Sequence, residues 1–386
     1  MLFKQKLIMI KLNFRILFLS ITLSLSTISL AQKEQKLFID SLDNAFDISH
    51  YLFNLHGLLP IVSPITEPAV GYGATLASLY FIPKKKDSTK YFQMPDIVAV
   101  AGGLTENNTW FAGGGYIGFW KDDHIRYRGI LGYGDIKLKY FGDGYSYLEE
   151  NPIHFSISST FLLQQAMFRI SDSRFMLGGK YIFTKSTVTI RNNSDLIDLS
   201  KDFNLTNSGI GLITEFENYD NVLSPNKGLR INLTYLQFSE IFGGDRNFGR
   251  LTFFTHYYIP LLNKRWISGF RIESQLATGE PPFYTNPFIM LRGLPAMRYQ
   301  GDLTALVETE QLFLLTPRWG INTFGGVGST FNIDKSKIEQ RAKAWNLGLG
   351  FRYLIARKLG LRMGIDLAKG PEDWGVYIIF ASAWIK

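Results

Sequence analysis

Hydrophobic and polar residues alternate along this chain from about Val70 to the last residue, Lys386. The alternation has a period of two, which is typical of β-strands with one apolar and one polar face. Turn residues divide the pattern into sixteen predicted strands, at approximately 57–64, 68–82, 95–105, 108–120, 124–140, 153–170, 174–190, 206–219, 227–239, 247–260, 264–278, 303–316, 318–332, 343–354, 358–368 and 373–385. The first strand is the weakest, because Pro60 and Pro64 interrupt it.

Two architectures share this pattern, a soluble β-sandwich and a transmembrane barrel, which differ in whether the apolar face meets a core or lipid. Sixteen strands are too many for one small sandwich. Tryptophans also gather at strand ends, beside the short turns (Trp120, Trp266, Trp319) and at the opposite ends (Trp110, Trp345, Trp374). Two aromatic girdles at the membrane interfaces account for this clustering. We therefore predict an all-β fold, a sixteen-stranded antiparallel transmembrane β-barrel at residues 57–386, with its longer connections at 141–152, 191–205, 279–302 and 333–342 on the external side.

A secretory leader precedes the predicted barrel. Basic residues up to Arg15 are followed by an apolar stretch at about 16–28 and by Ser29-Leu30-Ala31, a small-x-small cleavage pattern. An uncleaved helical anchor is the alternative, but the apolar stretch is short and contains serines and threonines. We predict a signal peptide at residues 1–31, cleaved near Ala31, and a final location in a bacterial outer membrane. Four of the basic residues behind the formal net charge of +8 lie in this leader, so the charge indicates no nucleic-acid partner.

Residues 32–56 form a short periplasmic segment in this prediction. Its apolar residues, with Asp40, Asp43 and Asp47 between them, fit a short amphipathic helix. About 25 residues are too few for an independent domain without cross-links, and the chain has no cysteine. The segment is either a periplasmic tail or a plug folded into the mouth of the barrel.

Three motifs carry a family resemblance. The loop after the eleventh strand reads Leu291-Arg292-Gly293-Leu294-Pro295, and the turn between strands eight and nine combines an acidic, an amide, a proline and a glycine position (Asp220, Asn221, Pro225, Gly228). The segment 66–73, TEPAVGYG, precedes the second strand. These features resemble the Arg-Gly loop, the turn and the opening hairpin of the bacterial surface antigen family, the BamA/TamA-type outer-membrane barrels.

The resemblance implies that Arg292 folds into the lumen and meets acidic side chains of the wall. Glu308 and Glu310 share one strand face, opposite to that of Val307, and are the proposed partners. The family often carries an acid one strand later, in a Phe-x-Asp-x-Gly pattern, but residues 324–328 read FGGVG here. The alternative is that Arg292 is a solvated loop charge. Other predicted lumen charges have both signs, which indicates a cross-braced interior (Arg230, Arg250, Arg271, Arg352, Arg362, Glu215, Glu217, Glu273, Asp366).

Family members that assemble or export proteins carry periplasmic receptor modules, and the sequence leaves no room for one between the leader and the first strand. The resemblance is thus to a short member, which assists the insertion or export of outer-membrane components. A passive diffusion channel or structural anchor is the alternative. The expected partners are outer-membrane lipids, other outer-membrane proteins as cargo, and the assembly machinery, which reads Phe380 and Trp384 on the last strand during insertion of the barrel itself.

Enzymatic and metal chemistry have little support in the sequence. His154 and His256 lie on predicted strands near serines or threonines, but neither belongs to a recognisable nucleophile motif. No histidine pair has metal-binding helical spacing. We therefore expect no enzymatic activity, cofactor or metal, and a barrel hydrolase remains a third and weaker alternative.

Overall fold

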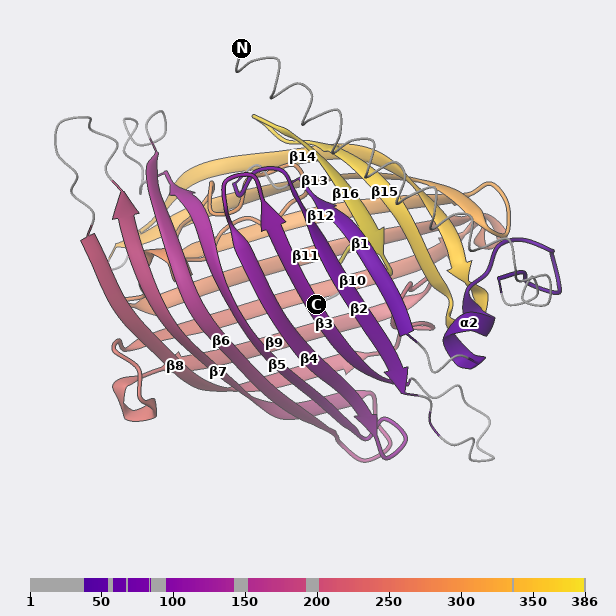
Figure 1. Ribbon diagram of the computed structural model, residues 1–386, viewed down its shortest axis with the longest axis horizontal. Coiled ribbons are helices and arrows are strands. Elements are labelled where there is room, and N and C mark those ends of the chain that lie inside the picture. The colour runs from indigo at the N-terminus through magenta and orange to yellow at the C-terminus, as the bar shows by residue number, and fades with distance from the viewer. Residues whose placement is uncertain are drawn as a thin grey trace, which may run out of the picture.

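In the computed structural model, the chain between Leu58 and Phe380 forms a sixteen-stranded antiparallel sheet, rolled into a nearly closed barrel (Figure 1). The structure describes residues 38–54, 58–66, 69–82, 84, 95–141, 152–191, 201–334 and 337–384. The strands are β1 (Leu58–Ile65), β2 (Gly73–Ile82), β3 (Asp96–Thr105), β4 (Trp110–Trp120), β5 (Ile125–Tyr140), β6 (Ile153–Arg169), β7 (Phe175–Arg191), β8 (Lys201–Glu217), β9 (Gly228–Phe238), β10 (Phe248–Leu261), β11 (Trp266–Gly279), β12 (Leu303–Leu314), β13 (Trp319–Asp334), β14 (Lys337–Ala356), β15 (Leu361–Lys369) and β16 (Trp374–Phe380).

The predicted number, order and direction of the strands are confirmed. Each strand pairs with its neighbours in the sequence, as expected when turns and loops join consecutive antiparallel strands. Four boundaries differ by five residues or more, the last of them the end of β16. β2 begins at Gly73, five residues after the predicted residue 68. β8 begins five residues before the predicted residue 206 and β14 six residues before the predicted residue 343. Most of the predicted external loop at 333–342 is therefore a continuation of the β13–β14 hairpin, whose two strands pair from Trp319 to Asp334.

The last strand was predicted to reach residue 385, and this is wrong. β16 ends at Phe380, and Ala381 adopts a left-handed conformation with φ of 67°. An extended strand does not continue through such a residue, so the chain turns away from the wall. Trp384 consequently lies inside the barrel with 2% of its surface exposed, and is not part of the strand that carries Phe380.

Side chains on the strands divide between an outer apolar face and the lumen, as the period of two requires. On β14, for example, Leu347 and Leu349 are 64% and 60% exposed, whereas Asn346 and Arg352 are buried. Exposed leucines at alternate positions of a sheet that encloses its polar residues form the surface that meets lipid.

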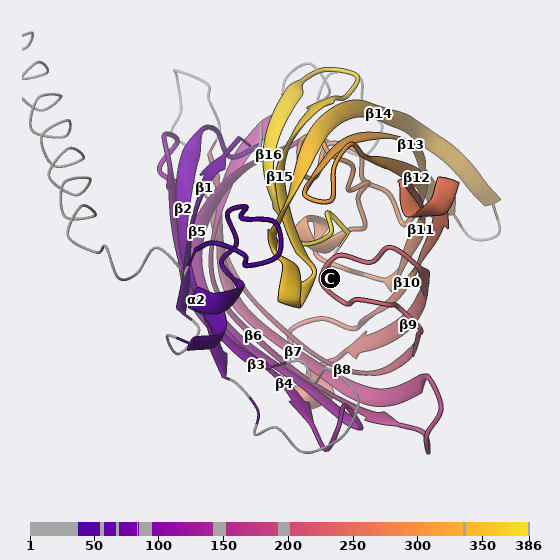
Figure 2. The same ribbon diagram turned by 90° about the vertical axis from the view of Figure 1, so that its right-hand side faces the viewer.

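The predicted signal peptide, residues 1–31, lies outside the described residues. Of the predicted periplasmic segment 32–56, residues 38–54 are described, and only Ser49–Asn54 are helical (α2). Within the described ranges, the structure has no helix long and apolar enough to span a bilayer. Figure 2, which looks at the end of the barrel where α2 lies, shows this segment over part of the opening. The segment is therefore docked on the rim and is not a free tail.

Arg318, in the turn between β12 and β13, anchors this segment. Its guanidinium contacts all three aspartates named in the sequence analysis, with distances of 2.5 Å to Asp40, 2.6 Å to Asp43 and 2.5 Å to Asp47. Asp40 also accepts a hydrogen bond of 2.7 Å from Nη2 of Arg357. Because its guanidinium holds three carboxylates, Arg318 fixes the loop between residues 40 and 47 at three points, and Arg357 adds further contacts.

We predict that Arg318→Ala releases the segment while the barrel stays folded. Chymotrypsin should then cleave after the half-exposed Phe46 roughly tenfold faster, because four charge-assisted hydrogen bonds to three carboxylates are lost. Arg265→Ala, which removes an exposed arginine from the neighbouring turn, is the matched control. Equal cleavage rates in the two variants would show that Arg318 does not hold the segment.

The same anchor predicts a dependence on pH. The hydrogen bonds from Arg318 lower the pKa of Asp43 from 3.8 to about 2. A carboxylate with a lowered pKa stabilises docking at neutral pH, and that contribution is lost as the pH falls from about 4 to about 2. A dye on Leu42→Cys, a unique thiol at an exposed position, should become more accessible to a soluble quencher over this range. In Arg318→Ala the dye should be accessible at every pH.

Candidate functional site

The long connection between β11 and β12 folds into the barrel and carries the Arg-Gly motif. Phe288 pairs with Gln300 through a β-bridge, which closes the base of an inner loop around residues 289–299. Gly293 has a φ of 86°, and a Cβ atom at this position would lie 2.9 Å from the backbone nitrogen of Gly370. Only glycine allows this approach to the β15–β16 turn, and the Gly293 N–H donates to the Tyr377 hydroxyl at 2.8 Å.

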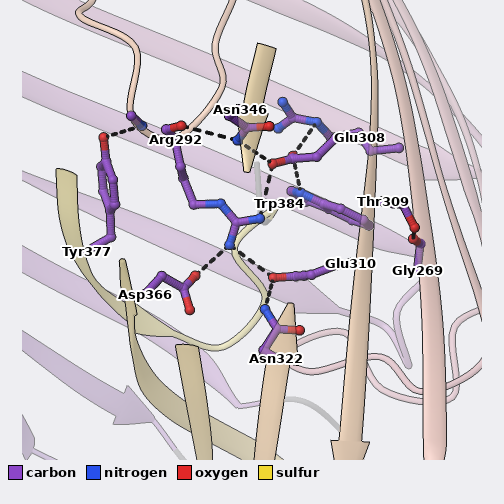
Figure 3. A network of polar contacts seen from close by, with 12 residues as sticks. Gly269, Arg292, Glu308, Thr309, Glu310, Asn322, Asn346, Asp366, Tyr377 and Trp384 are labelled. Carbon is purple, nitrogen blue, oxygen red and sulfur yellow. Dashed lines mark hydrogen bonds and ion pairs between the residues drawn. The ribbon is translucent and has the colours of Figure 1, made fainter. Parts of the chain in front are cut away.

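The Arg292 guanidinium occupies the centre of a buried charge network (Figure 3). It lies 3.1 Å from Glu308, 3.0 Å from Glu310 and 2.5 Å from Asp366, and its Cζ atom lies 3.5 Å from the centroid of the Phe324 ring. The arginine comes from a loop and the acids from β12 and β15. A planar guanidinium suits this position because it donates several hydrogen bonds at its edge and stacks on an aromatic ring with its face.

Further side chains complete the hydrogen bonds of the three carboxylates. Arg352 donates to Asp366 at 2.9 Å, and Arg271 lies 3.4 Å from Glu308. The remaining donors are Asn346 and the Trp384 indole on Glu308, at 3.2 and 2.7 Å, and Asn322 on Glu310, at 2.6 Å. Three arginines thus balance three acids, and this balance offsets the cost of removing the charges from water.

Glu308 and Glu310, the proposed partners of Arg292, both lie within ion-pair distance of it. Asp366 was predicted to face the lumen but was not proposed as a partner. It is the third carboxylate around Arg292. At Gly326, where the family pattern has an acid, a Cβ atom would lie 3.0 Å from Cβ of Glu308 and 2.9 Å from a backbone oxygen. The space for that acid is taken, and β15 supplies the third carboxylate instead.

The turn motif between β8 and β9 extends across the end of the lumen where α2 lies. Asp220 accepts hydrogen bonds from the backbone of Asn226 and Lys227, which closes the turn. Asn221 donates to the carbonyl of Leu359 at 2.9 Å, in the turn between β14 and β15. Pro225 is buried, and Gly228 has a φ of 119°. The Leu223 carbonyl accepts from Ser382 in the C-terminal tail, so this turn links β8 and β9 to the opposite wall.

A second group of charges lies on β5, β8 and β9, beside the turns that join β4 to β5 and β8 to β9. Arg126 lies 2.9 Å from Glu217, and Arg230 lies 2.9 Å from Glu215. Arg250, also predicted to face the lumen, donates to Gln275 at 2.8 Å. The predicted mixture of lumen charges is therefore arranged as separate clusters.

His256 is 2% exposed and lies between the rings of Phe254 and Trp384, at centroid distances of 4.8 and 5.6 Å. His154 is on the exposed outer face of β6. Across the described ranges, histidine, aspartate and glutamate side chains do not gather in threes at a place suited to a metal ion.

Comparison with known proteins agrees with this architecture. Residues 120–288 match the Omp85 superfamily domain. BamA from Haemophilus ducreyi lacking POTRA domains 1-3 aligns with a TM-score of 0.55 and 10% identity over 84% of this chain and 70% of that one. CdiB from Escherichia coli aligns with a TM-score of 0.57 and 11% identity, and CdiB from Acinetobacter baumannii with 0.51 and 16%. Each CdiB alignment covers 84% of this chain, and they cover 62% and 59% of the CdiB chains, respectively.

At identities of 10% to 16%, the likeness to these solved structures shows a similar fold and nothing more. This chain spans less than two thirds of the two CdiB proteins. No curated protein sequence matches it. The resemblance to BamA/TamA-type barrels stated from the motifs is confirmed, and the fold supports a place in a bacterial outer membrane.

We predict that Arg292→Ala leaves the barrel inserted but loosens the inner loop. Three buried carboxylates would then lack their shared cation, and breaking a buried ion pair in this way costs about 3–5 kcal/mol. Chymotrypsin added to intact cells should cleave the loop at residues 280–302 faster than in the unmodified protein. Trypsin is unsuitable because the substitution itself removes one of its sites.

Arg246→Ala is the matched control, because this exposed arginine touches the same loop only through a surface pair with Glu280 at 3.8 Å. Arg292→Lys keeps the charge without the planar fork and should give an intermediate rate. Unchanged cleavage of Arg292→Ala would contradict the bracing role.

Proposed function

Because this chain carries an Omp85 superfamily domain within a sixteen-stranded outer-membrane barrel, we propose that it assists the insertion or export of outer-membrane components. The route is the seam between its first and last strands. The proposal involves no enzymatic step. Its partners are the lipids around the seam, other outer-membrane proteins as cargo, and the assembly machinery that inserts the barrel itself.

The observation that carries this proposal is the missing pairing at the seam. Every other pair of neighbouring strands shares a ladder of backbone pairing, but among the described residues β1 and β16 share none. The two strands are adjacent, and the Thr66 hydroxyl donates to the Val376 carbonyl across the seam. Unpaired backbone groups in lipid are costly, so such an edge favours pairing with an incoming strand.

The N-terminal segment supports a seam that opens in a controlled way. Ile48 and Leu52 are buried at the periplasmic end, between residues of the first two strands (Leu59, Phe81) and residues of the other side (Ala356, Leu359, Leu361, Ala381). The segment thus bridges the seam from within, and Arg318 and Arg357 anchor it on the C-terminal side. Release of the N-terminal segment would remove apolar contacts between the two edges of the seam without breaking a strand ladder.

The diffusion-channel alternative is weakened by the same geometry. The inner loop, the Arg292 network and the C-terminal tail meet inside the lumen, and the β8–β9 turn crosses its periplasmic end. An interior braced in this way suits brief and small conductance steps more than a steady open pore.

The decisive test locks the seam. The natural chain has no cysteine, so Thr66→Cys with Val376→Cys introduces a unique pair that oxidation or a short bifunctional thiol reagent can join. Val62→Cys with Leu76→Cys is the matched control, because these residues face each other on strands that are already paired. Each variant is expressed in cells lacking the gene, and the outer-membrane proteins and lipids are quantified.

We expect deletion to deplete a small set of outer-membrane components. The locked seam should behave like the deletion, its reduced form should restore those components, and the control should restore them in both states. Full restoration by the locked barrel would contradict passage through the seam. An unchanged membrane after deletion would favour the channel or anchor.

A further inference from the structure

A cavity of about 850 Å³ lies inside the barrel against β3–β6. Its described lining includes none of the residues that contact Arg292. In the end view, these strands lie across the barrel from β11–β14, which carry most of the Arg292 network (Figure 2). The cavity is therefore a separate feature of the lumen.

The lining is apolar, although the lumen of a large membrane barrel is ordinarily polar. Ile97 and Ala101 on β3, Ile117 on β4, Ile130 on β5 and Phe161 on β6 all line it. On β3 the neighbouring Val100 is 55% exposed on the outer face, which confirms that Ala101 points inward.

Strand register accounts for the hollow. Ala101 stands opposite Gly113 on β4, and Gly113 stands opposite Gly132 on β5. Three neighbouring strands thus present almost no side chain to the lumen at one level, so the wall recedes there. Larger apolar residues above and below complete the lining.

The cavity is elongated along the strands. Its lining on β5 runs from Arg126 to Leu138, a span of roughly 40 Å along the strand. A volume of about 850 Å³ is at the upper end of the range for small-molecule sites. Because this volume extends over such a length, the cavity is narrow. A linear apolar chain fits such a shape better than a compact molecule.

One end of the cavity is charged, with an excess of arginine. Arg126, Arg128 and Arg230 line it together with Glu215 and Glu217. Both glutamates already contact Arg126 and Arg230, at distances between 2.9 and 3.4 Å. Arg126 also contacts Asp123, which pairs with Arg169 as well. Four arginines thus stand with three acids, and this positive balance favours an anionic head group at this end.

We propose that this cavity binds a long-chain carboxylate of the palmitate type. The acyl chain lies along the inner faces of β3–β6, where it is removed from water, and the carboxylate lies at the arginine-rich end beside Arg128. Apolar burial supplies most of the affinity, and the arginines set the orientation of the chain. This site does not depend on passage through the seam.

The test uses the full barrel in nanodiscs, released into a native mass spectrometer after incubation with palmitate. One bound palmitate per barrel is expected. Ala101→Trp fills the cavity and should lower the affinity at least tenfold, whereas Val100→Trp adds the same ring to the outer face and should leave it unchanged. Absence of a palmitate adduct, or equal affinities in the two variants, would overturn the proposal.

Two further measurements test the palmitate site without the Ala101→Trp variant, in case that variant does not fold. A palmitate analogue with a diazirine on its chain should label residues facing the lumen on β3–β6, and labelling confined to their outer faces would contradict the site. Hexadecanol, which lacks the charge, should bind more weakly than palmitate, and Arg128→Gln should remove that difference. Equal binding of the two ligands to the unmodified barrel would refute the orienting role of the arginines.

Discussion

The ion pairs of Arg292 with three buried carboxylates tie together parts of the chain that are far apart in sequence. The arginine belongs to the inner loop, two of the acids to β12 and the third to β15. Through Glu308 the network also holds Trp384, near the end of the described chain. A charge buried in the lumen requires a partner, so the loop, the wall and the tail are stable in these positions only together.

The lumen is divided into two chemically different halves. One half, around β11–β15, is filled by the inner loop, the charged network and the C-terminal tail. The other half, along β3–β6, has mostly small or apolar inward side chains, with arginines at one end, and retains a long cavity. A braced half keeps the barrel in shape without the need to fill the whole interior, so the second half is free to accept a ligand.

The seam is the place where the barrel departs from full closure. Proline residues in β1 limit its capacity to donate hydrogen bonds, and β16 is only seven residues long. The N-terminal segment compensates at one end of the seam by packing apolar residues between the two edges and by contacting Arg318. Closure therefore depends on a short docked segment and on side chains, which can be released at lower cost than a strand ladder.

Alternation with a period of two was enough to predict sixteen strands and their order. The strand number and the tryptophans at strand ends then placed the rows of leucines outside and the pair Glu308 and Glu310 inside. These features depend on residues close in sequence. Periodicity assigns residues to two faces of a strand but does not say which face is inside. For that reason the apolar inward face of β6, with Phe161, was not predicted. Asp366 beside Arg292, Trp384 in the lumen and three aspartates around Arg318 also required the tertiary structure. Each of these contacts joins segments that are far apart in the sequence and that meet only when the sheet curls into a barrel. Residues close in sequence therefore do not predict them.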